Sequence, residues 1–327
     1  MKNMDTSKNI SLRIWDYNND ADKIDSFLLS ASLAHKIPIK SREWFRWKFE
    51  ESPYGKAVLA CAFDGNQVVG CVGFGMGQMT YGVEDIKCAL SYENFVHPQY
   101  QGCHIFTKLI KLAEIECQQQ GVDILYNFPN HNSFPGYVKK GWVPKKISSY
   151  KIKLCNLVKC IRYFFDLKKG FIPLDSNLEH VRQYNIPAFC ATREEGVFIP
   201  QWTNEYLKWR FQTFKVGNYW IYENGEVFAI ARFGMRGHLK EAEILHIQGH
   251  QRAITKSDWK KVLKDLTQNT GVDFIGVSAS LEHPISAFTK CFIHVPSKSH
   301  FTYKVLSDKI KIDDFKMYKC DIDAHTY

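Results

Sequence analysis

The stretch His97-Pro-Gln-Tyr-Gln-Gly-Cys-His104 decides the fold, because it joins two segments of different periodicity. Residues 88–96 before it alternate like a strand, and residues 105 to about 120 after it have the apolar spacing of an amphipathic helix. Free backbone N–H groups converge at a helix start, and the helix dipole favours an anion there. Gly102 lets phosphate oxygens approach the main chain without a Cβ in the way. The turn therefore suits a pyrophosphate.

The residues after this helix extend the pattern. Gly121 ends the helix, and the apolar run Val122–Phe128 predicts a short strand. The segment Asn130-His-Asn-Ser-Phe-Pro-Gly-Tyr-Val-Lys-Lys-Gly-Trp142 closes the stretch. Together these elements predict an α/β unit built around the glycine turn.

The same pattern of motifs occurs twice along the chain. Ile37-Pro-Ile-Lys-Ser-Arg-Glu-Trp-Phe-Arg-Trp-Lys-Phe49 matches Ile199-Pro-Gln-Trp-Thr-Asn-Glu-Tyr-Leu-Lys-Trp-Arg-Phe211, and each string is followed by a hairpin signal, Asp64-Gly65 or Asn224-Gly225. Further matches follow in the same order, so we interpret the chain as a tandem duplication. The second copy has no glycine at the tight step of its turn, and Ser280 and Ala287 replace Asn130 and Tyr137. Its chemistry is expected to be lost.

Length and composition predict two globular domains in a reducing compartment. The chain has 327 residues, of which 45% are hydrophobic and 24% charged. The net charge of +9 divides into about +2 through residue 150 and about +7 beyond it, which suits an acidic small molecule and gives no run dense enough for DNA. Ten cysteines without a C-x-x-C pair, and a polar N-terminus, predict a cytoplasmic location.

Two segments bear on membranes. No run of apolar residues approaches the length that spans a bilayer. The shorter run Val158–Phe165 is interrupted by Lys159 and Arg162, and we expect a packed connector there, with an amphipathic surface anchor as the alternative.

The stretch from Glu93 to Trp142 resembles the coenzyme A core of the GNAT acyltransferase superfamily. That family's loop is Gln/Arg-x-x-Gly-x-Gly/Ala, and Gln99, Gln101 and Gly102 fit it, whereas His104 stands where a second small residue is usual. The family's downstream signature is matched by Asn130, Tyr137, Lys139, Gly141 and Trp142. The resemblance implies an α/β fold of the α+β type with two tandem units, each a mixed, mostly antiparallel sheet flanked by helices. We expect residues 1–157 to bind acyl-CoA and residues 158–327 to form a degenerate unit that binds the acceptor.

The resemblance also implies roles for individual residues. Tyr137 is expected to protonate the departing thiolate, the alternative being a ring packed under the sheet. Glu93 is the candidate base, with a strand salt bridge as its alternative, and water alone as a third possibility. Asn130 would bind the pantetheine arm or merely cap a turn. The full set of expected cofactor-binding residues is Phe95, Val96, Gln101, Gly102, Cys103, His104, Ile105, Phe106, Asn130 and Ser133.

The acceptor is less constrained than the acyl donor. The basic second half and the resemblance to a two-domain branch of surface-polysaccharide pathways favour the amine of a nucleotide-linked amino sugar. The alternatives are an aminoglycoside- or peptide-directed N-acetyltransferase and a non-catalytic acyl-CoA-binding module. No metal, nucleic acid or membrane span is expected. The candidate acceptor-binding residues are Trp44, His131, Arg210, His246 and His283.

Overall fold

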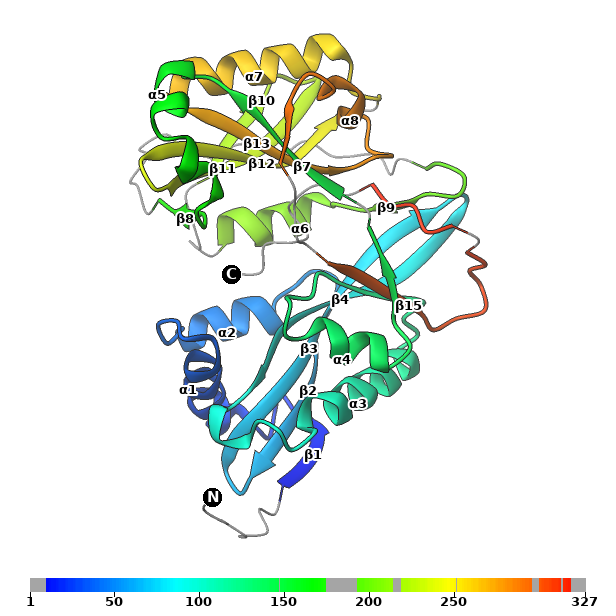
Figure 1. Cartoon of the computed structure of the whole chain (residues 1–327). Helices are drawn as coiled ribbons and strands as arrows, with labels where there is room; N and C mark the ends of the chain where they lie inside the picture. The colour runs from blue at the N-terminus through cyan, green and yellow to red at the C-terminus, as the bar shows by residue number, and fades with distance from the viewer. Residues whose placement is uncertain are drawn as a thin grey trace. The chain divides into compact units, whose positions relative to one another are not determined.

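The computed structural model describes residues 10–146, 148–174, 193–213, 219–250, 252–295, 300–312 and 314–318 (Figure 1). Two compact units interleave along the chain. The first contains residues 1–79, 85–145 and 299–311, and the second contains residues 80–84, 146–298 and 312–327. Each unit has its own sheet and helices, which confirms the predicted α/β class.

The first unit has an eight-stranded sheet in the order β1-β2-β3-β4-β5-β15-β6, with β9 paired to β3. The sheet is mostly antiparallel, and β4 and β5 form its parallel pair. Its elements are β1 (Ile10–Ile14), η1 (Ala21–Lys23), α1 (Ile24–His35), α2 (Arg42–Phe49), β2 (Val58–Asp64), β3 (Gln67–Tyr81), β4 (Glu84–Val96), η2 (Pro98–Tyr100), α3 (Ile105–Gln119), β5 (Ile124–Asn127), α4 (Phe134–Lys139), β6 (Val143–Lys145) and β15 (Phe301–Val305).

Local signals in the sequence account for several of these boundaries. The Ser41 hydroxyl accepts the N–H of Trp44 at 3.2 Å and so caps α2 as predicted. Gly65, with φ +58°, makes the predicted hairpin between β2 and β3. Alternate residues of β2 face two cores. One core packs against α3, and the other is an aromatic cluster that includes Phe27 of α1 and Phe45 of α2. In Figure 1, α1 and α2 accordingly lie on the opposite side of the sheet from α3.

The second unit repeats this plan with a seven-stranded sheet, in the order β10-β11-β12-β13-β7-β14, and β8 pairs with β11. Helix α7 packs with one core cluster of the sheet, and α6 packs with a second cluster that alternate side chains of β11 and β12 form together with β10. Its elements are β7 (Ser148–Leu154), α5 (Leu157–Arg162), η3 (Phe164–Lys168), β8 (Ile172–Pro173), β9 (Phe198–Pro200), α6 (Asn204–Lys208), the π-helical η4 (Trp209–Thr213), β10 (Tyr219–Glu223), β11 (Val227–Arg236), β12 (Leu239–Gly249), α7 (Lys256–Thr270), β13 (Phe274–Ser280), α8 (Ile285–Phe288) and β14 (Ile293–Val295).

The two sheets exchange their last long strands. Strand β7 follows the first copy in sequence but pairs antiparallel with β13 and β14 in the second unit. Strand β15 follows the second copy but pairs antiparallel with β5 and β6 in the first unit. The compact units are therefore not contiguous segments. Residues 146–157 belong to the second compact unit, whereas the sequence analysis assigned them to the first domain. The boundary at 157/158 between an acyl-CoA-binding and an acceptor-binding domain stays a prediction.

Candidate functional site

The first unit separates its two parallel strands beside the predicted site. The pairing of β4 with β5 ends at Leu90 opposite Tyr126, while β4 continues to Val96 and β5 stops at Asn127. The backbone of β4 beyond Leu90 thus runs on without β5 as its neighbour. An extended ligand arm can pair with strand backbone at such a position, which is where the pantetheine of coenzyme A was expected.

A left-handed residue interrupts the pleat in this part of β4. Glu93 has φ +52°, an uncommon conformation for a residue other than glycine. Residues three apart in a regular strand point to opposite faces of the sheet. Around Glu93, however, the side chains of Ser91 and Asn94 both contact the same group, the hydroxyl of Tyr137.

These three side chains form a closed hydrogen-bond network. The Tyr137 hydroxyl lies 2.7 Å from Ser91 Oγ and accepts from Asn94 Nδ2 at 3.0 Å. Asn94 Nδ2 also lies 3.0 Å from Ser91 Oγ, and its Oδ1 accepts the backbone N–H of Gly73 at 3.2 Å. Burial raises the pKa of Tyr137 well above that of an ordinary phenol, and the contacts with Ser91 and Asn94 oppose the rise. The phenol is therefore protonated at neutral pH.

Helix α4 and its neighbours fix the ring of Tyr137. Tyr137 is fully buried, with Phe106 edge-on at 5.6 Å and Trp142 at 4.7 Å between ring centroids. Trp142 is held in turn by donating Nε1–H to the Glu114 carboxylate at 2.6 Å. A Cβ on Gly136 would come within 2.8 Å of the Phe106 ring, so only glycine lets α4 approach α3 this closely. The buried ring is the packing arrangement that was the alternative for Tyr137, and its hydroxyl lies in a polar network; the acid role stays a prediction.

The glycine turn leads into an uncapped helix. Gly102 has φ +83°, and a Cβ placed there would meet no atom within 4 Å. His104, at the N-cap of α3, has φ 56° and makes no side-chain capping bond. A left-handed backbone at this position favours the small residue that the family loop usually has there. Histidine adopts the same conformation at a cost of about 1–2 kcal/mol. The first turn of α3 accordingly keeps backbone N–H groups without intrahelical acceptors.

The other expected residues of the turn have structural contacts of their own. Gln101 donates from Nε2 to the carbonyl of Val96 at 3.3 Å, which ties the turn to the end of β4. Cys103 is exposed, and Ile105 is buried in the core. The ring of Phe95 is buried against Phe27 at 5.0 Å, so Phe95 presents its backbone and not its side chain to a ligand.

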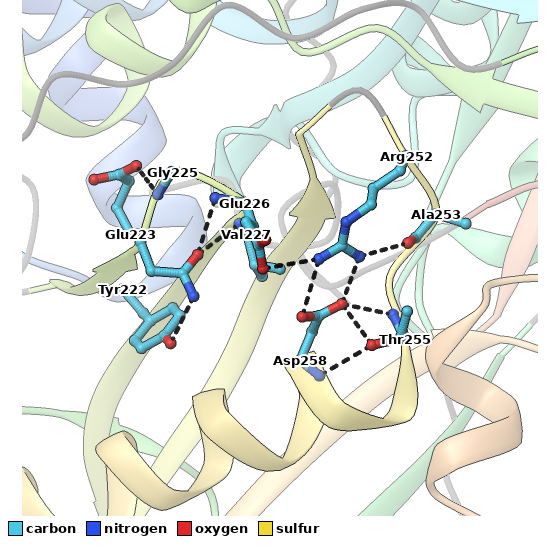
Figure 2. A network of polar contacts seen from close by, with 10 residues as sticks. Tyr222, Glu223, Gly225, Glu226, Val227, Arg252, Ala253, Thr255 and Asp258 are labelled. Carbon is cyan, nitrogen blue, oxygen red and sulfur yellow. Dashed lines mark hydrogen bonds and ion pairs between the residues drawn. The ribbon is translucent and has the colours of Figure 1, made fainter.

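The corresponding helix of the second copy is closed by its own carboxylate, as Figure 2 shows. The Thr255 hydroxyl accepts the N–H of Asp258 at 3.2 Å, and Asp258 accepts the N–H of Thr255 at 2.8 Å, which makes a capping box at the start of α7. Arg252 donates to both Asp258 oxygens, at 2.6 and 3.1 Å. Arg252 thereby holds the pKa of Asp258 well below its usual range. An anion supplied by the chain already sits at the helix start where the first copy has none.

Hydrogen bonds from its own residues also stabilise the turn of the hairpin beside this cap. Asn224 Oδ1 accepts the N–H groups of Glu226 and Val227 at 3.0 and 2.8 Å, and Arg252 reaches Glu226 at 3.2 Å (Figure 2). The sequence prediction that the second copy keeps the scaffold agrees with this arrangement.

Asn130 shapes the turn that precedes α4. Its Oδ1 accepts the N–H groups of Asn132 and Ser133, both at 3.0 Å, and its carbonyl accepts the N–H of Phe134 at 3.0 Å. The Ser133 hydroxyl returns to Asn130 at 3.2 Å, and His131 is exposed at the tip. This is the turn-forming role that was the alternative for Asn130, although α4 itself has no side-chain cap; a role toward pantetheine stays a prediction.

The candidate base is paired with a buried lysine. Lys48 Nζ lies 3.4 Å from Glu93 Oε1, and both side chains are largely buried. The same ammonium lies over the rings of Trp44, at 5.4 Å, and Tyr92, at 4.9 Å. Trp44 is itself buried in α2, so it contributes to this cluster from the core.

The candidate acceptor residues of the second unit are also buried. Arg210 lies over the ring of Phe211 at 5.4 Å. His246, on β12, lies 3.3 Å from Gln248 Oε1, and burial lowers its pKa to about 4. Burial and the nearby His246 lower the pKa of His283 to about 3. Both imidazoles are therefore neutral at neutral pH and would meet a ligand as hydrogen-bonding groups, not as cations.

The sequence missed Ser91, Asn94 and Lys48. Ser91 and Asn94 lie an odd number of positions apart on a predicted strand, so strand alternation assigns them to opposite faces. The left-handed Glu93 that brings them together has no signal in the sequence, because glycine or asparagine is the usual residue there. Lys48 lies in an aromatic-rich helix, where a lysine side chain is expected to be exposed to solvent.

Two absences concern the part of the chain that the structure describes. No group of three or more His, Cys, Asp or Glu side chains there is arranged to hold a metal ion. Among those same residues, no helix combines the length and apolar character needed to cross a membrane.

Comparison with known proteins gives a family match over part of the chain. The acetyltransferase (GNAT) domain family matches residues 21–144, and no curated protein matches the sequence. A GCN5-related N-acetyltransferase from Anabaena variabilis has a TM-score of 0.61 at 9% identity, covering 91% of this chain and 73% of that one. Eis1 from Mycobacterium abscessus gives 0.56 at 10%, and a probable N-acyltransferase of Enterococcus faecalis gives 0.58 at 11%, with the same coverages of 91% and 73%. The predicted tandem fold is confirmed.

Proposed function

We infer that this chain, in which residues 21–144 are an acetyltransferase (GNAT) domain, transfers an acyl group from acyl-CoA to the amine of a nucleotide-linked amino sugar. Its class, an acyl-CoA-dependent N-acyltransferase, follows from that domain. The acceptor and the residue roles are our proposal. We propose that catalysis belongs to the first unit.

The observation that carries this assignment is the contrast between two equivalent helix starts. Helix α3 begins at a glycine turn with no side-chain cap, so its N–H groups and dipole are available to a pyrophosphate. Helix α7 begins at the Thr255–Asp258 capping box, where a carboxylate fixed by Arg252 uses the same groups. A second anion at α7 would meet like charge. We therefore propose one coenzyme A site, at α3.

The Tyr137 network suits a general acid. In direct transfer the acceptor nitrogen attacks the thioester carbonyl, a C–N bond forms, the C–S bond breaks and the sulfur leaves as a thiolate that takes a proton. Tyr137 gives up that proton, and the phenolate that remains keeps Asn94 Nδ2 as a hydrogen-bond donor, with the Ser91 hydroxyl free to turn and donate as well. These contacts stabilise charge as it develops, which is how preorganised donors lower a barrier.

Glu93 is our candidate for the opposite proton transfer. The attacking amine must lose a proton, and a carboxylate can accept it directly or through water. Glu93 Oε1 lies 3.4 Å from Lys48 Nζ, and the left-handed backbone sets Glu93 apart from its strand neighbours. Replacing Glu93 with glutamine removes the base and should lower kcat on the order of 10²-fold, measured by coenzyme A release. A kcat unchanged by this replacement would assign the role to water.

The acceptor proposal rests on charge and on the second unit. The residues beyond 150 carry about +7 of the net charge of +9, which attracts an acidic acceptor such as a nucleotide diphosphate. Neutral His246 and His283 can donate and accept hydrogen bonds to a sugar or base. Arg210 is the candidate for contact with a phosphate, because a guanidinium binds phosphate in a bidentate manner.

A coenzyme A release assay tests the proposal. The purified chain is incubated with acetyl-CoA and longer or hydroxylated acyl-CoAs, and with a panel of nucleotide-linked amino sugars, aminoglycosides and peptides. Turnover should appear with the nucleotide-linked amines and fall as salt rises, since the attraction is electrostatic. Turnover confined to aminoglycosides or peptides would replace this acceptor. Tight acyl-CoA binding without turnover on any amine would indicate a binding module.

A further inference from the structure

We propose that the α5–η3 segment of the second unit docks on the surface of a lipid bilayer that contains anionic phospholipids. The segment follows β7 and is the one expected from the sequence to be a packed connector. The structure corrects that expectation for its outer side. This proposal is independent of the acyltransferase reaction and does not rest on the proposed acceptor.

The outer side of the segment is apolar. Five large hydrophobic side chains there are each more than half exposed, with Val158 at 79% and Phe165 at 78%. Leu157, Val158 and Ile161, spaced i, i+1 and i+4, lie on one side of α5, and the adjacent Phe164 and Phe165 begin η3. We call this set the connector surface: Leu157, Val158, Ile161, Phe164 and Phe165.

The inner side of the same segment is already packed. Cys160 is buried, and Tyr163 and Leu167 pack with it in a core cluster of the second unit. Asp166 is buried too, where it accepts from Lys169 Nζ at 2.6 Å and from the backbone N–H of His238 at 2.9 Å. One side of the segment is therefore packed in the core of the second unit. The five exposed apolar side chains lie on its other side and do not belong to that core.

The exposed charged side chains of the segment are all basic. Residues 155–174 contain four basic side chains and a single acidic one, Asp166, which is turned inward. Arg162, Lys168 and Lys169 are exposed, and Lys159 is partly exposed while it pairs with Asp273 at 2.6 Å. Apolar side chains interleaved with cations are the composition of helices that lie in the plane of a membrane interface. The cations match the negative surface of an anionic leaflet.

A lipid surface fits this segment better than a protein groove does. Helix α5 has six residues and η3 has five, which is short for the three or four turns by which an amphipathic helix fills a groove. Side chains that project with up to 79% exposure can each insert between lipid headgroups without a shaped partner. Adjacent Phe164 and Phe165, whose ring centroids are 5.9 Å apart, are of the residue type that interfacial segments insert into the headgroup region.

Co-sedimentation with sucrose-loaded vesicles tests the proposal on the full chain. One set of vesicles is phosphatidylcholine alone, and the other contains about one third phosphatidylglycerol. We expect wild type to sediment with the anionic vesicles and to be released by salt. The double variant Val158→Asp/Phe165→Asp should lower partitioning on the order of 100-fold, because each side chain of this size contributes about tenfold or more. Arg162→Glu/Lys168→Glu should lower it about tenfold or more on anionic vesicles.

A matched control and an oligomer measurement make the outcomes decisive. Leu281, also in the second unit, is 72% exposed outside the segment, so Leu281→Asp should sediment like wild type. Thermal unfolding checks that each variant is folded. Wild type that stays in the supernatant with both vesicles, or a Val158→Asp/Phe165→Asp variant that sediments normally, would overturn the proposal. So would an equal loss in Leu281→Asp. Light scattering that shows a wild-type dimer and a monomeric double variant would assign the connector surface to a second copy instead.

Discussion

Removing one oxygen atom, by Tyr137→Phe, separates the catalytic role of the phenol from its packing role. The ring would keep its contacts with Phe106 and Trp142, because phenylalanine has the same shape there. Ser91 and Asn94 would lose their partner in the hydroxyl but keep their mutual contact at 3.0 Å. We therefore expect a stability loss of only about 1 kcal/mol, at the low end for a buried polar group.

The catalytic loss should be much larger than the stability loss. A positioned general acid contributes about 10²–10⁴-fold to the rate, so kcat should fall on the order of 10²-fold or more while KM for acyl-CoA stays within about threefold. Because burial raises the pKa of Tyr137, its acidic form persists at high pH and is lost only as pH rises through that raised value. Wild-type kcat should therefore show no loss from Tyr137 below about pH 10.

A second tyrosine provides the control. Tyr17 is half-buried, and its hydroxyl donates to the carbonyl of Ala57 at 2.8 Å, away from the Tyr137 network and the glycine turn. Tyr17→Phe should cost similar stability, measured by thermal unfolding, with kcat unchanged in the coenzyme A release assay. A Tyr137→Phe enzyme with kcat within threefold of wild type, or equal losses in both variants, would refute the acid role.

Three further predictions follow from the turn, the cap and the exchanged strand. Gly102→Val forces a β-branched residue into φ +83° and should raise the acyl-CoA dissociation constant about tenfold by calorimetry, whereas Gly55→Val, equally left-handed and open, should not. Asp258→Asn should lower the free energy of unfolding by about 1–2 kcal/mol at pH 7. Because the pKa of Asp258 is depressed in the folded protein, this stability is present above about pH 4 and is lost as pH falls. The free energies of unfolding of wild type and variant should therefore converge when both are measured in acid. Ending the chain at residue 298 removes β15 and should abolish acyl-CoA binding and solubility, and retention of both would contradict the sheet pairing.

Local chemistry explains which parts of the fold the sequence predicted. Ser41 and the Asp64-Gly65 pair act over four residues or fewer, and both work as expected. The exchange of β7 and β15 between the two sheets could not be predicted from the sequence, for a physical reason. Tyr150-Lys-Ile152 and Tyr303-Lys-Val305 have the same pattern, so each strand suits either sheet and its sequence does not choose between them.

The candidate site divides in the same way. The glycine turn and Tyr137 were found because each has a fixed spacing from its neighbours along the chain. The partners of Tyr137 depend on the backbone of Glu93, whose left-handed conformation is imposed by its surroundings and runs against its own preference. Similarly, the capping box at Thr255 and Asp258 has the spacing of a common helix start, and only its Arg252 clamp shows that the position is closed to another anion.

The strand exchange has a consequence for how the protein is made. The sheet of the first unit needs Phe301–Val305, which is synthesised long after β5. Until then, β5 presents an unpaired edge, which is prone to pairing with other chains. Synthesis from the N-terminus would usually let a first domain fold early. Here the first unit is completed only after most of the second unit has been synthesised, so a chain that stops before β15 carries the glycine turn without the full sheet that would support it.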